Sequence, residues 1–225
     1  MTTSLLPAVL LEPPGKATHS VIWLHGLGAD GNDFVPIVPE LGLHPSLRVR
    51  FVFPHAPIQP VTLNGGMRMR AWYDITELNL KRTTDEPTIR ANAKRVRDLI
   101  AREQAEGIPS HRIALAGFSQ GGALALFTGL RHPDRLAGIL GLSCYLLCAD
   151  SFDTELSPAN RATPVFLAHG SRDPVVPVAG GEQAHARLKN AGVPVEYAVF
   201  PMQHEVCWDE IRAIGAFLNR RFEAV

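Results

Sequence analysis

Six short and almost uninterrupted apolar runs recur along the chain, and longer segments with a different periodicity separate them. The runs cover residues 21–24, 49–53, 113–116, 138–142, 165–168 and 195–200, and residues 9–11 are a candidate edge strand. Strands that are apolar on both faces are typical of a parallel sheet with helices on both sides. The alternation of such strands with helical segments therefore predicts an α/β fold with a mostly parallel central sheet.

Four segments have the apolar spacing of helices. The first follows a capping signal at 84–87, repeats its apolar residues at intervals of four, three and four, and ends at Gly107. The others cover about residues 119–132, 180–190 and 207–222. The segment 55–83 has neither periodicity and is longer than an ordinary connection, so we expect an ordered loop on the substrate side of the molecule.

The composition excludes several classes of protein. The chain has 225 residues, 46% of them hydrophobic, and one domain covering 1–225 can bury a full core. Its formal net charge of +0 argues against nucleic-acid binding, which needs a basic surface. No apolar stretch approaches the ~18 residues of a membrane span, and no positive charge precedes the first leucines, so we expect neither stable membrane insertion nor a signal peptide.

The number of cysteines indicates the cellular compartment of the protein. Cys144, Cys148 and Cys207 are odd in number, which favours reduced thiols in a cytoplasmic protein over a secreted disulfide scaffold. His204 lies close to Cys207 in the sequence, which raises a zinc site as an alternative. The chain lacks the close cysteine pairs typical of zinc ligands, so we expect no metal.

The pattern Gly117-Phe-Ser119-Gln-Gly121 stands between a predicted strand and a predicted helix. A serine on such a tight turn projects its hydroxyl above the sheet, and flanking glycines let strand and helix approach closely. The N-terminus of the following helix adds unpaired N–H groups and a positive dipole end. Ser119 is therefore the candidate nucleophile, and a glycine-flanked serine that only packs a crossover is the alternative.

A serine nucleophile needs a base and an acid, which follow it in the order acid and then histidine in hydrolases with this motif. Of nine histidines, His204 fits best, because it follows the strand at 195–200. Asp173 follows the strand at 165–168, whereas Glu205 adjoins the histidine and cannot readily face it. Asp173 alone would be interpreted as a turn cap, but with Ser119 and His204 it completes a triad.

The oxyanion of acyl transfer needs two backbone N–H donors. We expect one from Gln120, the residue after the nucleophile, and one from Leu27 in the glycine-rich loop 25–31 that follows the first long strand. A phosphate-binding loop is the alternative interpretation of 25–31. The loop has neither the G-x-G-x-x-G pattern nor a Gly-Lys-Ser/Thr ending.

With these pieces in place, the sequence resembles the small carboxylesterases and acyl-protein thioesterases of the α/β-hydrolase fold. The matching stretches are 25–31, 72–74, 117–122, 169–177 and 204–206, in the order of that family. The resemblance implies an α/β-hydrolase domain with Ser119, Asp173 and His204 as the triad and Leu27 and Gln120 at the oxyanion hole. It also implies no cofactor, a cytoplasmic location and a homodimer.

The hypothesis is a serine hydrolase that cleaves short- to medium-chain carboxylic esters through an acyl-serine. We expect apolar residues of the 55–83 loop to contact the acyl chain, and the candidates are Leu63, Met67, Met69 and Trp72. Simple packing of these residues onto the domain is the alternative. Two rival activities are a thioesterase or lysophospholipase acting on long acyl chains, and a peptidase. A non-catalytic binding protein with a hydrolase fold is the rival from another class.

Overall fold

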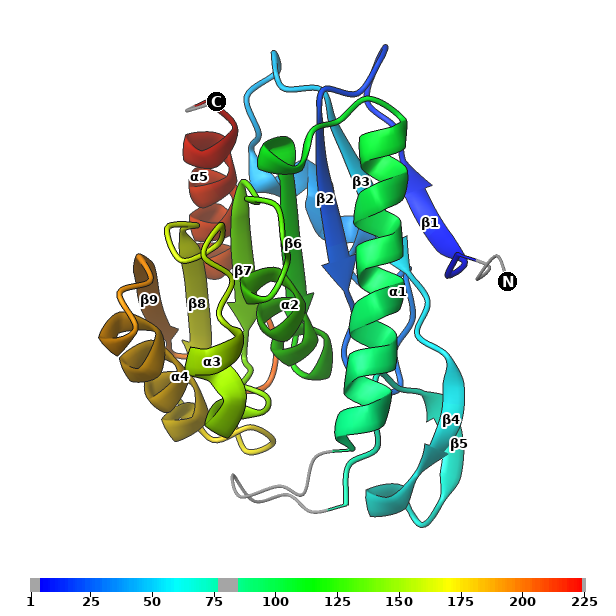
Figure 1. Cartoon of the computed structure of the whole chain (residues 1–225), viewed down its shortest axis with the longest axis vertical. Helices are drawn as coiled ribbons and strands as arrows, with labels where there is room; N and C mark the ends of the chain where they lie inside the picture. Colours follow the sequence, from blue (N-terminus) through cyan, green and yellow to red (C-terminus); the bar gives the residue numbers. More distant parts are fainter. Residues whose placement is uncertain (1–4, 77–84, 224–225) are drawn as a thin grey trace.

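The strands predicted from the apolar runs form one twisted sheet. The computed structural model describes residues 5–76 and 85–223, and in that part of the chain seven strands lie in the order β1-β3-β2-β6-β7-β8-β9 (Figure 1). All neighbours are parallel except β1, which runs antiparallel to β3. The strands are β1 (Ala8–Leu11), β2 (His19–Leu24), β3 (Val49–Pro54), β6 (Ile113–Phe118), β7 (Gly138–Leu142), β8 (Val165–Gly170) and β9 (Val195–Phe200).

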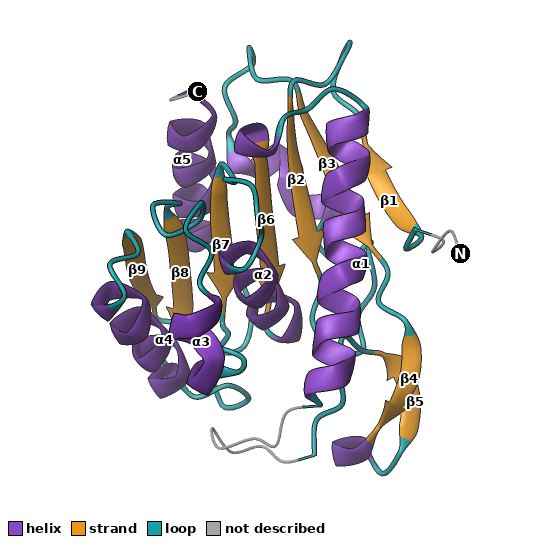
Figure 2. Ribbon diagram, in the orientation of Figure 1, coloured by secondary structure: helices purple, strands orange, loops and turns teal. Residues whose placement is uncertain are grey.

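Helices cover both faces of this sheet (Figure 2). One face carries α1 (Glu86–Ala105), α2 (Gln120–Leu130), the short α3 (Phe152–Glu155) and α4 (Val178–Asn190). The other face packs against α5 (Trp208–Glu223) and a 3-10 segment, Val35–Leu41. Successive side chains of β2 point to opposite faces of the sheet. Ile22 packs into the core on the side of α1 and α2, and Val21 and Trp23 pack into the core on the side of α5, so both faces of the strand are apolar.

The topology places a crevice at the carboxyl ends of β2 and β6. From β2 the chain continues to β3 on one side, whereas β6 pairs with β2 on the other side and leads away to β7. The following connections leave toward opposite faces, since Val35–Leu41 packs with one core and α2 with the other. Ligands in open α/β sheets bind at such a switch point.

The predicted loop at 55–83 contains an element that the sequence analysis missed. Strands β4 (Ile58–Val61) and β5 (Met67–Arg70) form an antiparallel hairpin outside the main sheet. The hairpin projects beside the N-terminal end of α1 (Figure 1). The end of the predicted loop, residues 77–83, and the first residue of the capping signal at 84–87 lie outside the described residues, but Asp85 accepts the Thr88 N–H as a helix cap.

Glu210, in the first turn of α5, is a carboxyl group with no exposed surface. Burial raises its pKa to about 8, and the nearby backbone N–H of Cys207 offsets only part of this rise. Neither carboxylate oxygen makes a well-formed hydrogen bond within the described residues. The folded protein therefore holds a proton on Glu210 that the unfolded chain releases at a lower pH.

Replacing Glu210 with glutamine is expected to stabilise the protein in alkaline solution. The pKa of Glu210 rises from 4.5 to about 8 on folding, so wild-type stability falls as the pH rises through this window. The loss is on the order of a few kcal/mol, and glutamine removes it while keeping the side-chain shape. Urea unfolding at pH 5 and pH 9 measures this, with Asp209→Asn at the exposed neighbouring position as the control. Equal pH slopes for wild type and Glu210→Gln would contradict the prediction.

Candidate active site

The turn from β6 to α2 holds Ser119 in a strained backbone conformation. Its φ is 54° and its ψ is −120°, although it carries a side chain. The two glycines of the motif make the turn possible. A Cβ on Gly117 would lie 2.4 Å from the Gly121 carbonyl, and a Cβ on Gly121 would lie 2.4 Å from the carbonyl oxygens of Leu24 and His25. The local sequence thus forces the hydroxyl of Ser119 out above the sheet.

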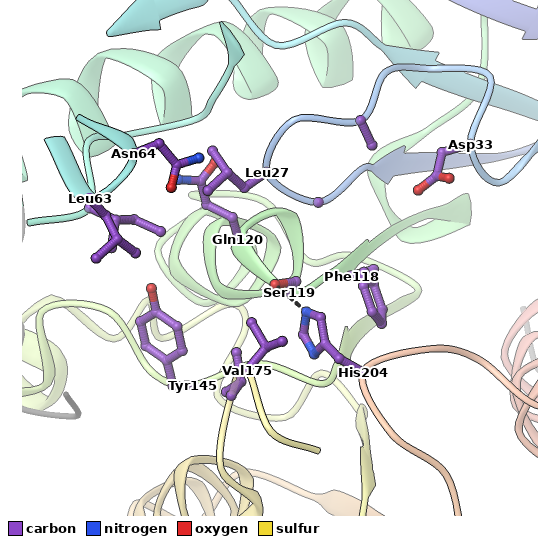
Figure 3. Close-up of a pocket in the computed structure, with 14 residues that line it drawn as sticks. Leu27, Asp33, Leu63, Asn64, Phe118, Ser119, Gln120, Tyr145, Val175 and His204 are labelled. Carbon is purple, nitrogen blue, oxygen red and sulfur yellow. Dashed lines mark hydrogen bonds between the residues drawn. The ribbon is translucent and has the colours of Figure 1, made fainter. Parts of the chain in front are cut away.

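Ser119, His204 and Asp173 form a continuous hydrogen-bonded series, of which Figure 3 shows the bond between Ser119 and His204. The His204 Nε2 lies 2.9 Å from the Ser119 Oγ, and the His204 Nδ1 lies 2.6 Å from the Asp173 Oδ2. The aspartate side chain is fully buried, and its other oxygen accepts the N–H groups of Val175 and Val176 at 2.8 and 2.9 Å. A carboxylate held in this way orients the imidazole so that Nε2 faces the hydroxyl.

A second histidine, His169, lies behind the carboxylate. Its Nε2 is 3.6 Å from the Asp173 Oδ2 and 2.8 Å from the Val176 carbonyl oxygen, and burial lowers its pKa. This residue stands at the end of β8, and its hydrogen bond to the Val176 carbonyl oxygen supports the turn at Asp173.

The two residues predicted to supply N–H groups for the oxyanion line the same cavity as Ser119. Leu27 follows β2, and Gln120 begins α2. Among the hydrogen bonds of the described residues, neither of these N–H groups donates to another protein atom. Two such donors above a serine hydroxyl can stabilise a developing oxyanion.

The cavity above Ser119 has a volume of about 310 Å³ and two unlike sides. Figure 3 shows Leu63, Tyr145 and Val175 on one side of Ser119, and Asp33 with Phe118 on the other side, beside His204. The side away from His204 is thus lined by apolar and aromatic side chains, whereas the side beside His204 also carries a carboxyl group. Burial and the nearby Asp30 raise the pKa of Asp33. The full lining is Gly26, Leu27, Ala29, Asp33, Leu63, Asn64, Ile75, Phe118, Ser119, Gln120, Tyr145, Val175, Val176 and His204.

Comparison with known proteins agrees with this geometry. The family described as Phospholipase/Carboxylesterase matches residues 7–221, which is nearly the whole chain. The chain belongs to the phospholipase/carboxylesterase family. It is a serine hydrolase that acts on carboxylic esters.

The similarity to individual relatives extends over most of this chain. It is 41% identical to acyl-protein thioesterase 1 of Neurospora crassa, over 97% of this chain and 93% of that protein. Among solved structures, Arabidopsis thaliana SOBER1 has a TM-score of 0.86 at 32% identity and covers 90% of this chain and 98% of its own. Zea mays acyl-protein thioesterase 2 also has a TM-score of 0.86, at 27% identity, and covers 96% of this chain and 99% of its own. These values confirm the predicted α/β-hydrolase fold.

Three of the predicted substrate contacts in this phospholipase/carboxylesterase need correction. Leu63 lines the cavity, but Met67, Met69 and Trp72 do not. Met67 is 64% exposed on β5, and Met69 packs its sulfur near Gly28. Trp72 is fully buried, and its indole N–H donates to the His25 carbonyl oxygen. Met67 and Met69 lie on a hairpin outside the main sheet and Trp72 lies in the interior, so the structure places all three side chains outside the lining of the cavity.

Two cavity residues, Ile75 and Tyr145, lie in no motif that the sequence analysis identified. They come from connections far apart in the chain, and only the tertiary structure brings them together. Val175 and Val176 also line the cavity and follow Asp173 after Pro174, so the turn that holds the acid also supplies part of the cavity wall.

The described residues give no support to the alternative of a metal site. No three His, Cys, Asp or Glu side chains in that part of the chain are grouped so that they could hold an ion. Both ring nitrogens of His204 instead have hydrogen-bond partners in Ser119 and Asp173, which leaves neither nitrogen to bind zinc.

None of the helices within the described ranges is long and apolar enough to cross a membrane.

Proposed function

We propose that Ser119, His204 and Asp173 hydrolyse short- to medium-chain carboxylic esters by two-step acyl transfer. The observation that carries this proposal is the series of hydrogen bonds, 2.9 and 2.6 Å long, from the Ser119 hydroxyl through His204 to Asp173. Ser119 attacks the ester carbonyl while His204 takes its proton, and the N–H groups of Leu27 and Gln120 bind the oxyanion. His204 then protonates the leaving alcohol and activates the water that cleaves the acyl-serine.

The cavity sets the proposed range of acyl chains. Its volume of about 310 Å³ is near the lower end of the range for ligand pockets, about 300–1,000 Å³. Because His204 protonates the leaving group, the acyl chain lies on the side of the cavity away from His204, which holds Leu63, Tyr145 and Val175. An apolar space of this size favours short and medium chains over a full-length fatty acyl group.

Hydrolysis of thioesters is the second candidate. The relatives at 36–41% identity are named acyl-protein thioesterase 1, and the same triad chemistry cleaves a thioester as readily as an ester. In this case the acyl group would be long and the leaving group a thiol. A lysophospholipase activity would likewise require a long-chain optimum.

One experiment tests the mechanism and separates the two candidates. p-Nitrophenyl esters and matching thioesters with two to sixteen acyl carbons are hydrolysed, and acid-quenched enzyme is mapped by mass spectrometry. We expect kcat/KM to peak at short to medium esters and the acyl group to be found on Ser119. A long-chain or thioester optimum favours the second candidate. Acylation of a residue other than Ser119 contradicts the proposed mechanism.

We further propose that the enzyme works in the cytoplasm as a homodimer. No disulfide joins the three cysteines within the described residues, which is in keeping with a reducing compartment. The dimer follows from the resemblance to small carboxylesterases. Sedimentation equilibrium tests it, and a single species with the 24.5 kDa mass of one chain contradicts it.

A further inference from the structure

The segment 70–73, which begins at the last residue of β5, is hydrogen-bonded to the residue that begins α2. The side chain of Gln120 is buried, and its two polar atoms hold two successive residues of the segment. The Trp72 N–H donates to the Gln120 Oε1 at 2.7 Å, and the Gln120 Nε2 donates to the Tyr73 carbonyl oxygen at 2.7 Å. The residue that offers one oxyanion N–H is thus fixed by its own side chain.

The same segment also holds the loop that offers the other oxyanion N–H. The Trp72 indole donates to the His25 carbonyl oxygen at 2.9 Å, and the Gly28 N–H donates to the Arg70 carbonyl oxygen at 2.9 Å. These two bonds lie on either side of Leu27 in the sequence. They are needed because the pairing of β2 with β6 ends at Leu24 and Gly117, so the sheet itself does not fix the two loops beyond that point.

Asn92 of α1 anchors this segment from behind. Its side chain is 1% exposed, and its Nδ2 donates to the Trp72 carbonyl oxygen at 2.6 Å. Its Oδ1 accepts a hydrogen bond from Arg95 at 2.9 Å, which fixes the orientation of the amide. Asn92 does not line the cavity. A buried amide bonded through both its nitrogen and its oxygen holds its partners rigidly, because an unmade bond there costs about 1–3 kcal/mol.

We propose that Asn92 is a positioning residue that, through Trp72, sets the relative placement of the Leu27 and Gln120 N–H groups. The inference rests on the proposed function, since it assigns the frame that aligns the oxyanion hole. Stabilisation of an oxyanion requires both donors at about 2.7–3.1 Å from the developing charge. A shift of the 70–73 segment moves both donors, because it is bonded to both loops.

The test replaces Asn92 with aspartate, which keeps the shape but exchanges the Nδ2 donor for an oxygen facing the Trp72 carbonyl. Hydrolysis of an ester is compared with that of its thionoester, in which C=S replaces C=O and the acyl and leaving groups are unchanged. The sulfur anion is a weaker hydrogen-bond acceptor, so an aligned hole accelerates the ester more. We expect kcat for the ester to fall about tenfold with little change in KM, and the ester-to-thionoester ratio of kcat/KM to fall with it.

Asn160→Asp is the matched control. Asn160 is also fully buried, and its Nδ2 donates to the carbonyl oxygens of His132 and Asp134 at 2.7 and 2.8 Å. It precedes β8 and so lies at the opposite end of the sheet from Ser119. The same chemical change is therefore expected to lower the melting temperature and leave the ester-to-thionoester ratio unchanged.

The ratio does not depend on how much protein is folded, so partial unfolding cannot imitate the expected result. If Asn92→Asp does not fold, Gln120→Glu removes the bond from Nε2 to the Tyr73 carbonyl oxygen and is expected to lower the same ratio. A folded variant with the wild-type ratio would overturn the inference. The proposed function fails by a different outcome, which is acylation of a residue other than Ser119 in the wild-type enzyme.

Discussion

Replacing Ser119 with alanine is expected to lower kcat for ester hydrolysis by about 10⁴-fold or more, with the fold intact. The change removes the Oγ that lies 2.9 Å from the His204 Nε2, and the chain has no other hydroxyl in hydrogen-bond contact with that nitrogen among its described residues. Alanine has the same backbone preferences at φ 54° as serine, so the strained turn is unchanged. The loss of one hydrogen bond costs only about 1 kcal/mol of stability.

Two further variants serve as a control for this measurement and as a test of the backbone strain at Ser119. Ser20→Ala is the matched control, because Ser20 is fully buried on β2 and its Oγ has no hydrogen-bond partner in the described chain. Its kcat is expected to equal that of the wild type. Ser119→Gly is expected to be as inactive as the alanine variant but more stable by about 1–3 kcal/mol, since glycine relieves the strain at this position. Ester turnover by purified Ser119→Ala within tenfold of the wild type would show that another group is the nucleophile.

The central strands of the main sheet could be predicted from the sequence because they are buried on both faces. The run at 138–142 coincides with β7, and the run at 113–116 lies within β6, Ile113–Phe118. A strand of this kind needs apolar residues at every position, which leaves a continuous signal in the sequence. In α1 the helical stripe that includes Ile89 and Val96 is indeed the buried face.

The β4–β5 hairpin could not be predicted in the same way. Its strands pair only with each other, and the exposed side chains of Ile58 and Met67 show that it buries little apolar surface. Pro60 within β4 argues against a strand, and Pro is tolerated there because the strand is at an edge. Without a buried face, such a hairpin has no periodic apolar pattern.

The proposed triad and the substrate contacts differ in how far they follow from the sequence. The order of Ser119, Asp173 and His204 and their places after strands are properties of the chain, and the structure brings all three into contact. Which way a loop side chain points is decided by distant partners. Trp72 is turned inward because its backbone and indole bond to residues 25, 92 and 120, none of them near it in the sequence.

Asp173→Asn is expected to lower kcat by about 10⁴-fold through the tautomer of His204. In the wild type a carboxylate accepts at this place, so the imidazole N–H that faces it is on Nδ1 and Nε2 is left to receive the proton of Ser119. The N–H groups of Val175 and Val176 both point at the Asp173 Oδ1. They will hold the amide oxygen of an asparagine in that place.

The amide NH₂ of the Asp173→Asn variant then faces His204 and donates to Nδ1, which forces the proton onto Nε2 and blocks its role as a base. The measurement is kcat/KM for a short-chain ester, with a melting curve to show that the variant folds. Glu205→Gln is the control, because Glu205 is exposed and its hydrogen bond within the described residues is a long one, 3.4 Å from the Gln203 N–H, so the loss of its charge should leave kcat unchanged. If Asp173→Asn kept activity within tenfold of the wild type, the orientation of His204 would have to come from the packing of Phe118 against its ring, whose centroids are 4.7 Å apart, and not from the carboxylate.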